Sequence, residues 1–319
     1  MRFVTFSSDQ QHWPGLVIDE FSLLNLKLAF AMAGRKGSAD TARPAPKDLL
    51  AVIAGGADML AACRELLSTA RDGGLPAAIV AVKDVKIVAP IPRPLKNVFC
   101  VGSNYRAHVS EANRAQAKAD VAPKLPVFFT KPPTAVIGPG DSVLLDPLVS
   151  DKMDYEVELG VVIGKAGRNI RAADALDHIF GFTIINDVTA RDLQRAHGGQ
   201  YLKGKGLDTT CPMGPQIVTI DELGSGANLR IRLSVNGVTR QDDTTENMIF
   251  SIPTLLESLS QGLTLEPGDL LATGTPKGVG YAMQPPCYLQ DGDVVTCEIE
   301  GIGKLSNVVR EMALSAAVV

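Results

Sequence analysis

The chain has only five cysteines among 319 residues, and no two of them form a C-x-x-C pair. An odd set without paired spacing excludes a disulfide framework and a zinc knuckle, and it is typical of a reducing compartment. No apolar run reaches the roughly 18–20 residues that a membrane span needs. Residues 1–10 lack the apolar run of a signal peptide, so we expect a cytoplasmic protein without membrane association.

The chain also lacks an excess of basic residues. Its formal net charge is −4 and its pI is about 5.6, which argues against nucleic acid as a partner because phosphate contacts need a basic field. Hydrophobic residues make up 45% of the sequence and charged residues 21%. A chain of this length and composition can bury a full core, in one large domain or two ordinary ones.

Residues 1–90 have the pattern of a small α+β domain. Short β-type runs occupy 2–6 and 15–18, and apolar residues recur at helical spacing over 57–70. The prolines in the segment 89–94 can continue neither a helix nor a central strand. We therefore predict a domain junction there, with a second domain over residues 91–319.

Residues 91–319 are dominated by strand and turn signals. Apolar and polar residues alternate over 229–235 before Asn236-Gly237, which is a strong hairpin signal, and they alternate again over 295–299. Helices are expected only at about 172–178, 188–197 and 253–259. The sequence predicts an α+β class with mixed or antiparallel β-sheets rolled into a barrel or sandwich.

Two carboxylates lie two residues apart at the start of an apolar run. Glu156 and Glu158 would point to the same face of a strand, and Asp187 ends a second apolar run. Buried carboxylates repel one another, and a divalent cation removes that cost. Three acids without a nearby His or Cys predict an oxygen-ligated site for Mg²⁺, with Mn²⁺ or Ca²⁺ as alternatives.

The same alternation is also typical of an antiparallel strand with one solvated face. The pattern alone leaves open whether the Glu156/Glu158 pair is buried or points to solvent.

Two further spacings indicate local contacts. His108 and Glu111 are separated by three residues, so on one helical turn the carboxylate could orient the imidazole as a general base, although a surface ion pair has the same spacing. Asp187, Arg191 and Gln194 have the spacing of one helix face, if a helix begins where the strand ends.

Eight segments, in order over about 220 residues, resemble the fumarylacetoacetate hydrolase superfamily in its bacterial two-domain form. They are 102–111 (GSNYRAHVSE), 131–132 (KP), 154–159 (DYEVEL), 186–194 (NDVTARDLQ), 204–208 (GKGLD), 211–215 (CPMGP), 273–280 (TGTPKGVG) and 300–303 (EGIG). No single segment is specific for the family, but the occurrence of all eight segments in the family's order is specific for it.

The resemblance implies roles for the candidate residues. The metal ligands would be Glu156, Glu158 and Asp187, and the catalytic residues would be His108, Glu111 and Lys205. The substrate-binding residues would be Arg191, Gln194, Tyr105 and Thr275.

The resemblance also implies an Mg²⁺-dependent hydrolase that cleaves a carbon–carbon bond of an acylpyruvate, fumarylpyruvate or fumarylacetoacetate type of 1,3-diketo acid through a metal-stabilised enolate, as in the breakdown of aromatic compounds. A small 2-oxo acid would be the substrate, and a homodimer is expected. The alternative is a tautomerase or isomerase, decarboxylase or dehydratase that acts with the same metal site on a 2-oxo acid such as oxaloacetate or 2-hydroxyhepta-2,4-diene-1,7-dioate. A remote alternative is a non-catalytic metal-binding module.

Overall fold

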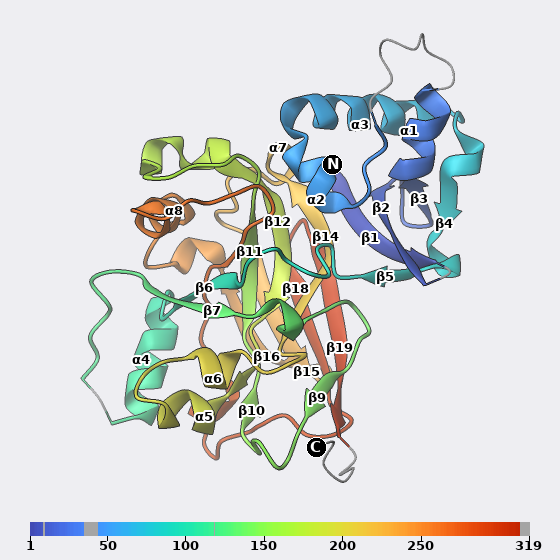
Figure 1. Cartoon of the computed structure of the whole chain (residues 1–319). Helices are drawn as coiled ribbons and strands as arrows, with labels where there is room; N and C mark the ends of the chain where they lie inside the picture. The colour runs from blue at the N-terminus through green and yellow to red at the C-terminus, as the bar shows by residue number, and fades with distance from the viewer. Residues whose placement is uncertain (9, 35–43, 118, 313–319) are drawn as a thin grey trace, which may run out of the picture.

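The fold is seen in a computed structural model that describes residues 1–8, 10–34, 44–117 and 119–312 (Figure 1). The described strands form a twelve-stranded sheet, a five-stranded sheet and a two-stranded ribbon. The N-terminal elements are β1 (Arg2–Ser8), β2 (Gln11–Val17), β3 (Ser22–Asn25), α1 (Leu26–Gly34), α2 (Leu49–Ala54), α3 (Gly56–Arg71), β4 (Ile79–Ala81) and β5 (Lys86–Val88).

The larger sheet runs from the N-terminal strands into the rest of the chain. Its other strands are β6 (Val98–Gly102), β7 (Val127–Lys131), β8 (Val136–Ile137), β11 (Val157–Ile163), β12 (Ile179–Asn186), β14 (Cys211–Thr219) and β17 (Leu270–Ala272). The strand order is β4-β3-β2-β1-β14-β12-β11-β17-β6-β7, with β5 on β1 and β8 on β14. Antiparallel pairing of β1 with β14 therefore continues the sheet across the junction predicted near residue 90.

The smaller sheet contains the predicted hairpin. Its order is β16 (Val238–Thr244), β15 (Arg230–Val235), β18 (Val294–Ile299), β19 (Gly303–Glu311) and β9 (Val143–Leu145). Asn236 and Gly237 both have positive φ, as a tight two-residue turn between twisted strands requires. The strands predicted over 229–235 and 295–299 and the turn predicted at Asn236-Gly237 are confirmed.

The two sheets pack face to face. Val157, Leu159, Val161 and Ile163 of β11 enter the core between the sheets, together with apolar residues of β15, β18 and β19. Because successive side chains of a strand point to opposite faces, Glu158 and Val162 lie on the other face of the sheet. The predicted strand-rich α+β sandwich is confirmed, while a closed barrel does not form.

A second core joins the N-terminal elements to the other face of the larger sheet. Side chains of α1, α2 and α3 pack there with Val162, Phe180 and Met213 from the central strands. The helix predicted over 57–70 is confirmed as α3.

The remaining helices are short. They are α4 (Arg106–Ala115), α5 (Arg191–Ala196), α6 (Leu202–Lys205), α7 (Ile220–Leu223) and α8 (Ile252–Ser260). One-turn or longer 3₁₀ segments are η1 (Pro76–Ala78), η2 (Val82–Asp84), η3 (Pro133–Ala135), η4 (Ala172–His178), η5 (Thr245–Asn247) and η6 (Gly280–Ala282). The helix predicted at 172–178 is thus a 3₁₀ helix, and the one predicted at 253–259 is confirmed. Within the described part of the chain, no helix has the length and apolarity to cross a bilayer.

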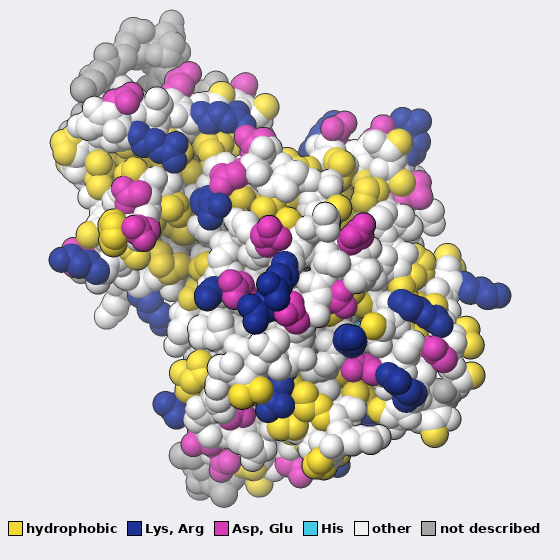
Figure 2. Space-filling model, turned by 180° about the vertical axis from the view of Figure 1, so that it is seen from behind, with side chains coloured by type: hydrophobic (Ala, Val, Ile, Leu, Met, Phe, Trp, Pro, Cys, Tyr) yellow, Lys and Arg dark blue, Asp and Glu magenta, His cyan; other side chains and the backbone are white. Residues whose placement is uncertain are grey.

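Figure 1 shows α4, α5 and α6 gathered beside β7 and β10 (Met153–Asp154), away from the N-terminal helices. The two-stranded ribbon pairs β10 with β13 (Thr189–Ala190) in the same region. Acidic and basic side chains are interspersed over the face in Figure 2 rather than gathered by sign. The gathered helices mark the end of the molecule at which the candidate site lies.

Replacement of Phe3 by Ala tests whether the N-terminal strand belongs to the common core. Phe3 is fully buried and its ring centroid lies 5.3 Å from that of Phe180. We expect Phe3→Ala to lower the free energy of unfolding by about 3–5 kcal/mol in urea titrations. Phe21→Ala is the control, because Phe21 is 71% exposed, and it should change stability by less than about 0.5 kcal/mol. Equal effects of the two substitutions would contradict the shared core.

Candidate active site

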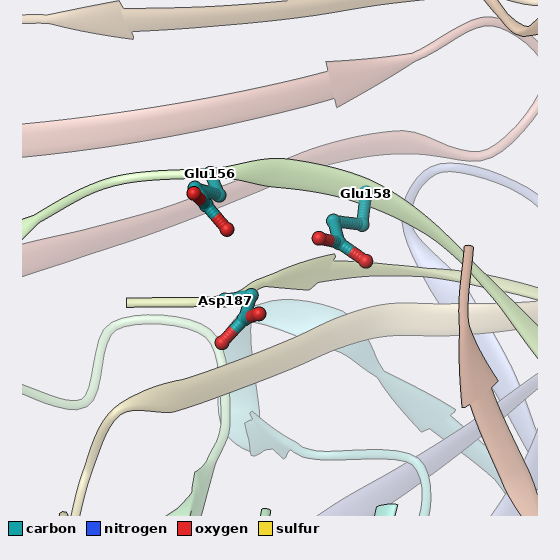
Figure 3. A group of neighbouring side chains, drawn as sticks. All are labelled: Glu156, Glu158 and Asp187. Carbon is teal, nitrogen blue, oxygen red and sulfur yellow. The ribbon is translucent and has the colours of Figure 1, made fainter. Parts of the chain in front are cut away.

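Three buried carboxylates converge at the end of β11 and β12. Glu156 immediately precedes β11, Glu158 lies within it and Asp187 immediately follows β12. Val157 is paired with Asn186, and the Asp187 amide donates to the Glu156 carbonyl over 2.8 Å. One oxygen of each carboxylate lies within 4.8 Å of the others, and Figure 3 shows the three groups facing one another.

All three acids are buried, with exposed fractions of at most 4%. The alternative in which the Glu pair lies on a solvated face is therefore wrong. The reason is that both faces of the larger sheet are covered at β11. The polar residues of this strand therefore point into a buried acidic site and not into solvent, while the apolar residues point into the core.

Glu158 is the acid with the least compensation. Its carboxylate accepts a hydrogen bond from the Gly274 amide over 2.7 Å, and no cationic side chain among the described residues forms an ion pair with it. Burial, and then the charges of Asp187 and Glu156, raise the pKa of Glu158 well above its ordinary value. A group of oxygen ligands with this uncompensated charge could hold a divalent cation.

Lys205 connects two of the acids. Its Nζ donates to Glu156 Oε2 over 2.5 Å and to Asp187 Oδ2 over 2.7 Å. Burial opposes the charge on Lys205, but Asp187 and Glu156 outweigh it and raise the pKa of the ammonium group. The preceding residue, Gly204, packs against the backbone of Gln194, where a Cβ would lie 2.4 Å from the Gln194 nitrogen, so α6 lies close against α5.

Arg191 is buried and held on every side. Its Nε donates to Asp154 over 2.8 Å, its Nη2 to Glu156 over 2.6 Å and its Nη1 to Gln194 over 3.2 Å. The guanidinium carbon lies 4.4 Å from the centre of the Tyr281 ring. Burial opposes the charge on Arg191, yet its acidic partners raise the pKa of the guanidinium further.

The prediction that Asp187, Arg191 and Gln194 share one helix face is wrong in detail. Helix α5 begins at Arg191, because the preceding backbone is extended and pairs as β13 with β10. Asp187 therefore enters the site from the end of a strand. The three side chains nevertheless gather around the same site. Glu156 and Lys205 link Asp187 to Arg191, and Arg191 donates to Gln194.

Two buried partners of this cluster did not emerge from the sequence as functional residues. Lys131 is fully buried at the end of β7 and donates to Asp187 Oδ1 over 2.7 Å, to the Val188 carbonyl and to the Lys205 carbonyl. Asp154 accepts from Arg191 and from the amides of residues 280 and 281. A charged residue at the end of an apolar strand was the available signal for Lys131.

The predicted His108–Glu111 contact is present on α4. His108 Nδ1 and Glu111 Oε1 are 3.0 Å apart, and both Glu111 oxygens accept from the Gly278 amide. His108 is 8% exposed, so the pair is not a surface ion pair. With Nδ1 on the carboxylate side, the imidazole presents Nε2 as its remaining nitrogen.

A cavity of about 470 Å³ opens onto these groups. The residues predicted from the sequence that line it are His108, Glu156, Glu158, Arg191, Gln194, Lys205 and Thr275. Thr275 also accepts a hydrogen bond from Gln241 over 2.8 Å. Tyr105 is not among the lining residues, because its side chain is fully buried and its hydroxyl has no hydrogen-bond partner.

Residues 97–310 match the family described as fumarylacetoacetate (FAA) hydrolase, C-terminal. The chain belongs to the fumarylacetoacetate hydrolase family. The match covers the segments that carry the resemblance, and it includes the acidic triad, the His108–Glu111 pair and the cations Arg191 and Lys205. This is a family of enzymes. In this chain the candidate site is built from carboxylate oxygens and buried cations.

Similar proteins extend the comparison beyond that domain. Oxaloacetate tautomerase YisK of Bacillus subtilis (strain 168) is 43% identical over 309 residues, which are 96% of this chain and 99% of that protein. Human mitochondrial oxaloacetate tautomerase FAHD2A is 46% identical over 225 residues, 70% of this chain and 69% of its own length. The solved structure of a fumarylacetoacetate hydrolase from psychrophilic Exiguobacterium antarcticum is 37% identical with a TM-score of 0.78, covering 98% of this chain and 100% of that one.

Replacement of Glu158 by Gln separates metal binding from folding. Because the folded-state pKa of Glu158 is raised, ionisation costs the metal-free protein stability as pH rises above the unfolded value of about 4.3. Metal-free Glu158→Gln should therefore be more stable than wild type at pH 8, on the order of 1 kcal/mol. Its divalent-cation affinity should fall by more than the roughly 100-fold that loss of an outer partner costs.

Thermal unfolding and calorimetric Mg²⁺ titration measure both effects of Glu158→Gln. Wild type should gain thermal stability on Mg²⁺ addition and the variant should not. A variant that is less stable than wild type without metal, or that binds Mg²⁺ as tightly as wild type, would contradict the assignment of Glu158 as a metal ligand.

Lys131→Met tests the structural role of the buried lysine. It leaves Asp187 without one of its two cations, so we expect a loss of about 3–5 kcal/mol in the free energy of unfolding, measured in urea. Lys86→Met is a matched control, because the Lys86–Asp141 ion pair has a lysine side chain that is 58% exposed. That substitution should cost less than about 1 kcal/mol, and a similarly small effect at Lys131 would contradict the prediction.

Proposed function

We propose that this protein is a Mg²⁺-dependent tautomerase that interconverts the enol and keto forms of a 2-oxo diacid of the oxaloacetate type. The observation that carries the proposal is a buried acidic triad beside a cavity that Glu156, Glu158 and His108 line. The chain is also 43% identical over nearly its full length to a protein named oxaloacetate tautomerase. The hydrolase expected first from the sequence has less support among these relatives than the tautomerase kept as its alternative.

The triad fits a hard cation because it offers only carboxylate oxygens, and Glu156, Glu158 and Asp187 would hold it. When bound, the ion would act as a Lewis acid that stabilises negative charge on a 2-oxo acid substrate. Lys205 and Arg191 lower the pKa of Glu156 and hold its carboxylate in place, and their positive charge favours negative charge that develops on the substrate oxygen.

His108 is the group that we propose to move the proton. Glu111 holds its Nδ1, so Nε2 can take a proton from C3 of the keto acid while electron density shifts to the C2 oxygen. Return of that proton from the imidazolium to the C2 oxygen completes the enol, so atoms and charge balance. The Gly278 N–H, shared between both carboxylate oxygens, keeps Glu111 in place during the transfer.

Hydrolysis of an acylpyruvate is a second candidate because the cavity, at about 470 Å³, has room for more than a four-carbon diacid. A structural neighbour named fumarylacetoacetate hydrolase shares the fold over 98% of this chain. In that reaction His108 Nε2 would take its proton from a water molecule, and the same cations would favour the leaving enolate.

Purified protein loaded with Mg²⁺ should be given the enol form of oxaloacetate and, separately, acetylpyruvate. We expect loss of the enol absorbance well above the uncatalysed rate and its abolition by EDTA. Acetylpyruvate cleavage without tautomerase activity would replace the proposal by the hydrolase. Activity on neither compound would refute both. The cytoplasmic location and homodimer expected from the sequence remain predictions.

His108→Asn and Glu111→Gln test the proton-transfer role. Each should lower kcat by about 10²–10⁴-fold, because general acid–base catalysis contributes on that order. Affinity for Mg²⁺ should stay within a few-fold, since neither residue is in the acidic triad. His12→Asn, on the exposed side of β2, is the control and should keep full activity. Unchanged kcat in His108→Asn would remove His108 from the mechanism.

A further inference from the structure

Arg195 is a cation at the opening of the cavity that the mechanism has not used. It lies one turn after Arg191 on α5, is exposed, and lines the same cavity. Its guanidinium carbon lies 5.0 Å from the centre of the Tyr281 ring, the ring that also contacts Arg191. Arg195 is therefore held at the cavity by its contact with an aromatic face rather than by a carboxylate.

The other cations around the cavity already have acidic partners. Arg191 is paired with Asp154 and Glu156, and Lys205 with Glu156 and Asp187. Each of the three Arg191 nitrogens has an acceptor. In contrast, no ion pair or hydrogen bond to Arg195 occurs among residues 1–312 as described, so its guanidinium N–H groups are available to a ligand.

Position along the cavity distinguishes the two arginines. Glu156, a predicted metal ligand, contacts Arg191, and Arg191 shares the Tyr281 ring with Arg195. Arg195 is thus the next cation outward from the acidic triad. A 2-oxo diacid bound through its 2-oxo acid end at the triad would place its second carboxylate outward in the cavity.

We propose that Arg195 binds the second carboxylate of the substrate and makes the enzyme selective for 2-oxo diacids over 2-oxo monoacids. A guanidinium suits this role because its planar N–H groups match a carboxylate. Tyr281 is the positioning residue for Arg195: it is 8% exposed, and its amide donates to Asp154. This inference rests on the proposed function, since it assumes a diacid substrate.

The test compares two compounds in two proteins. The compounds are oxaloacetate and its 4-amide, 2-oxosuccinamate, which has the same shape without the second charge. Arg195→Gln should lower kcat/KM for oxaloacetate by about 10–100-fold, mainly through KM, because hydrogen bonds to charged groups contribute about 1.5–3 kcal/mol. Its kcat/KM for the amide should stay within about 2-fold of wild type.

Two further variants make the result specific. Arg195→Lys keeps the charge without the planar fork and should recover part of the preference for the diacid. Arg114→Gln removes an exposed arginine from α4 that does not line the cavity, so it should leave the preference unchanged while altering net charge equally. If Arg195→Gln affects both compounds equally, or neither, the inference is overturned.

Calorimetric binding of the same two compounds to the Mg²⁺-loaded proteins separates this inference from the proposed function. If wild type turns over neither compound, the proposed function fails, and the binding data still decide the role of Arg195. Tighter binding of oxaloacetate than of the amide in wild type, lost in Arg195→Gln, supports it. Equal binding of the two compounds by wild type refutes it.

Discussion

The structure of the site depends on an excess of buried carboxylates over buried cations. Four buried carboxylates, Asp154, Glu156, Glu158 and Asp187, face three buried cations, Lys131, Arg191 and Lys205, so full ionisation leaves one negative charge. Desolvated charges of this kind are tolerated only where each has partners. Glu158 lacks a cationic partner, and a divalent cation would supply it. The rest of the site can be understood as the support that holds the other charges in place.

That support comes from the pairing of two strands. Register between β11 and β12 sets Glu156 beside Asp187, and covering both faces of the sheet keeps the pair away from water. The apolar residues of β11 that alternate with the glutamates are packed in the core between the sheets. Turning the glutamates to the other face would therefore also turn these apolar residues out of that core. The geometry of the acids is therefore a property of the whole sandwich.

The same arrangement suits more than one reaction of the family. A cation that takes a 2-oxo acid, with fixed positive charges beside it, favours an enolate whether that enolate arises by loss of a C3 proton or by cleavage of a carbon–carbon bond. In the mechanism that we propose, the choice between these depends on what lies opposite His108 Nε2, a substrate carbon or a water molecule. The shape and charge of the outer cavity, where Arg195 and Tyr281 lie, then influence which substrate is held there.

The sequence by itself determined the local relations. Spacing of two put Glu156 and Glu158 on one face of a strand, spacing of three brought His108 to Glu111, and Asn236-Gly237 closed a hairpin, because these depend only on backbone geometry within a few residues. The burial of the acids, the partnership of Lys131 with Asp187 across 56 residues and that of Asp154 with Arg191 across 37 were decided by the tertiary structure. So was the exclusion of Tyr105 from the cavity. No short-range pattern encodes which strands become neighbours. Only the pairing of strands that are distant in the sequence brings these carboxylates and cations together.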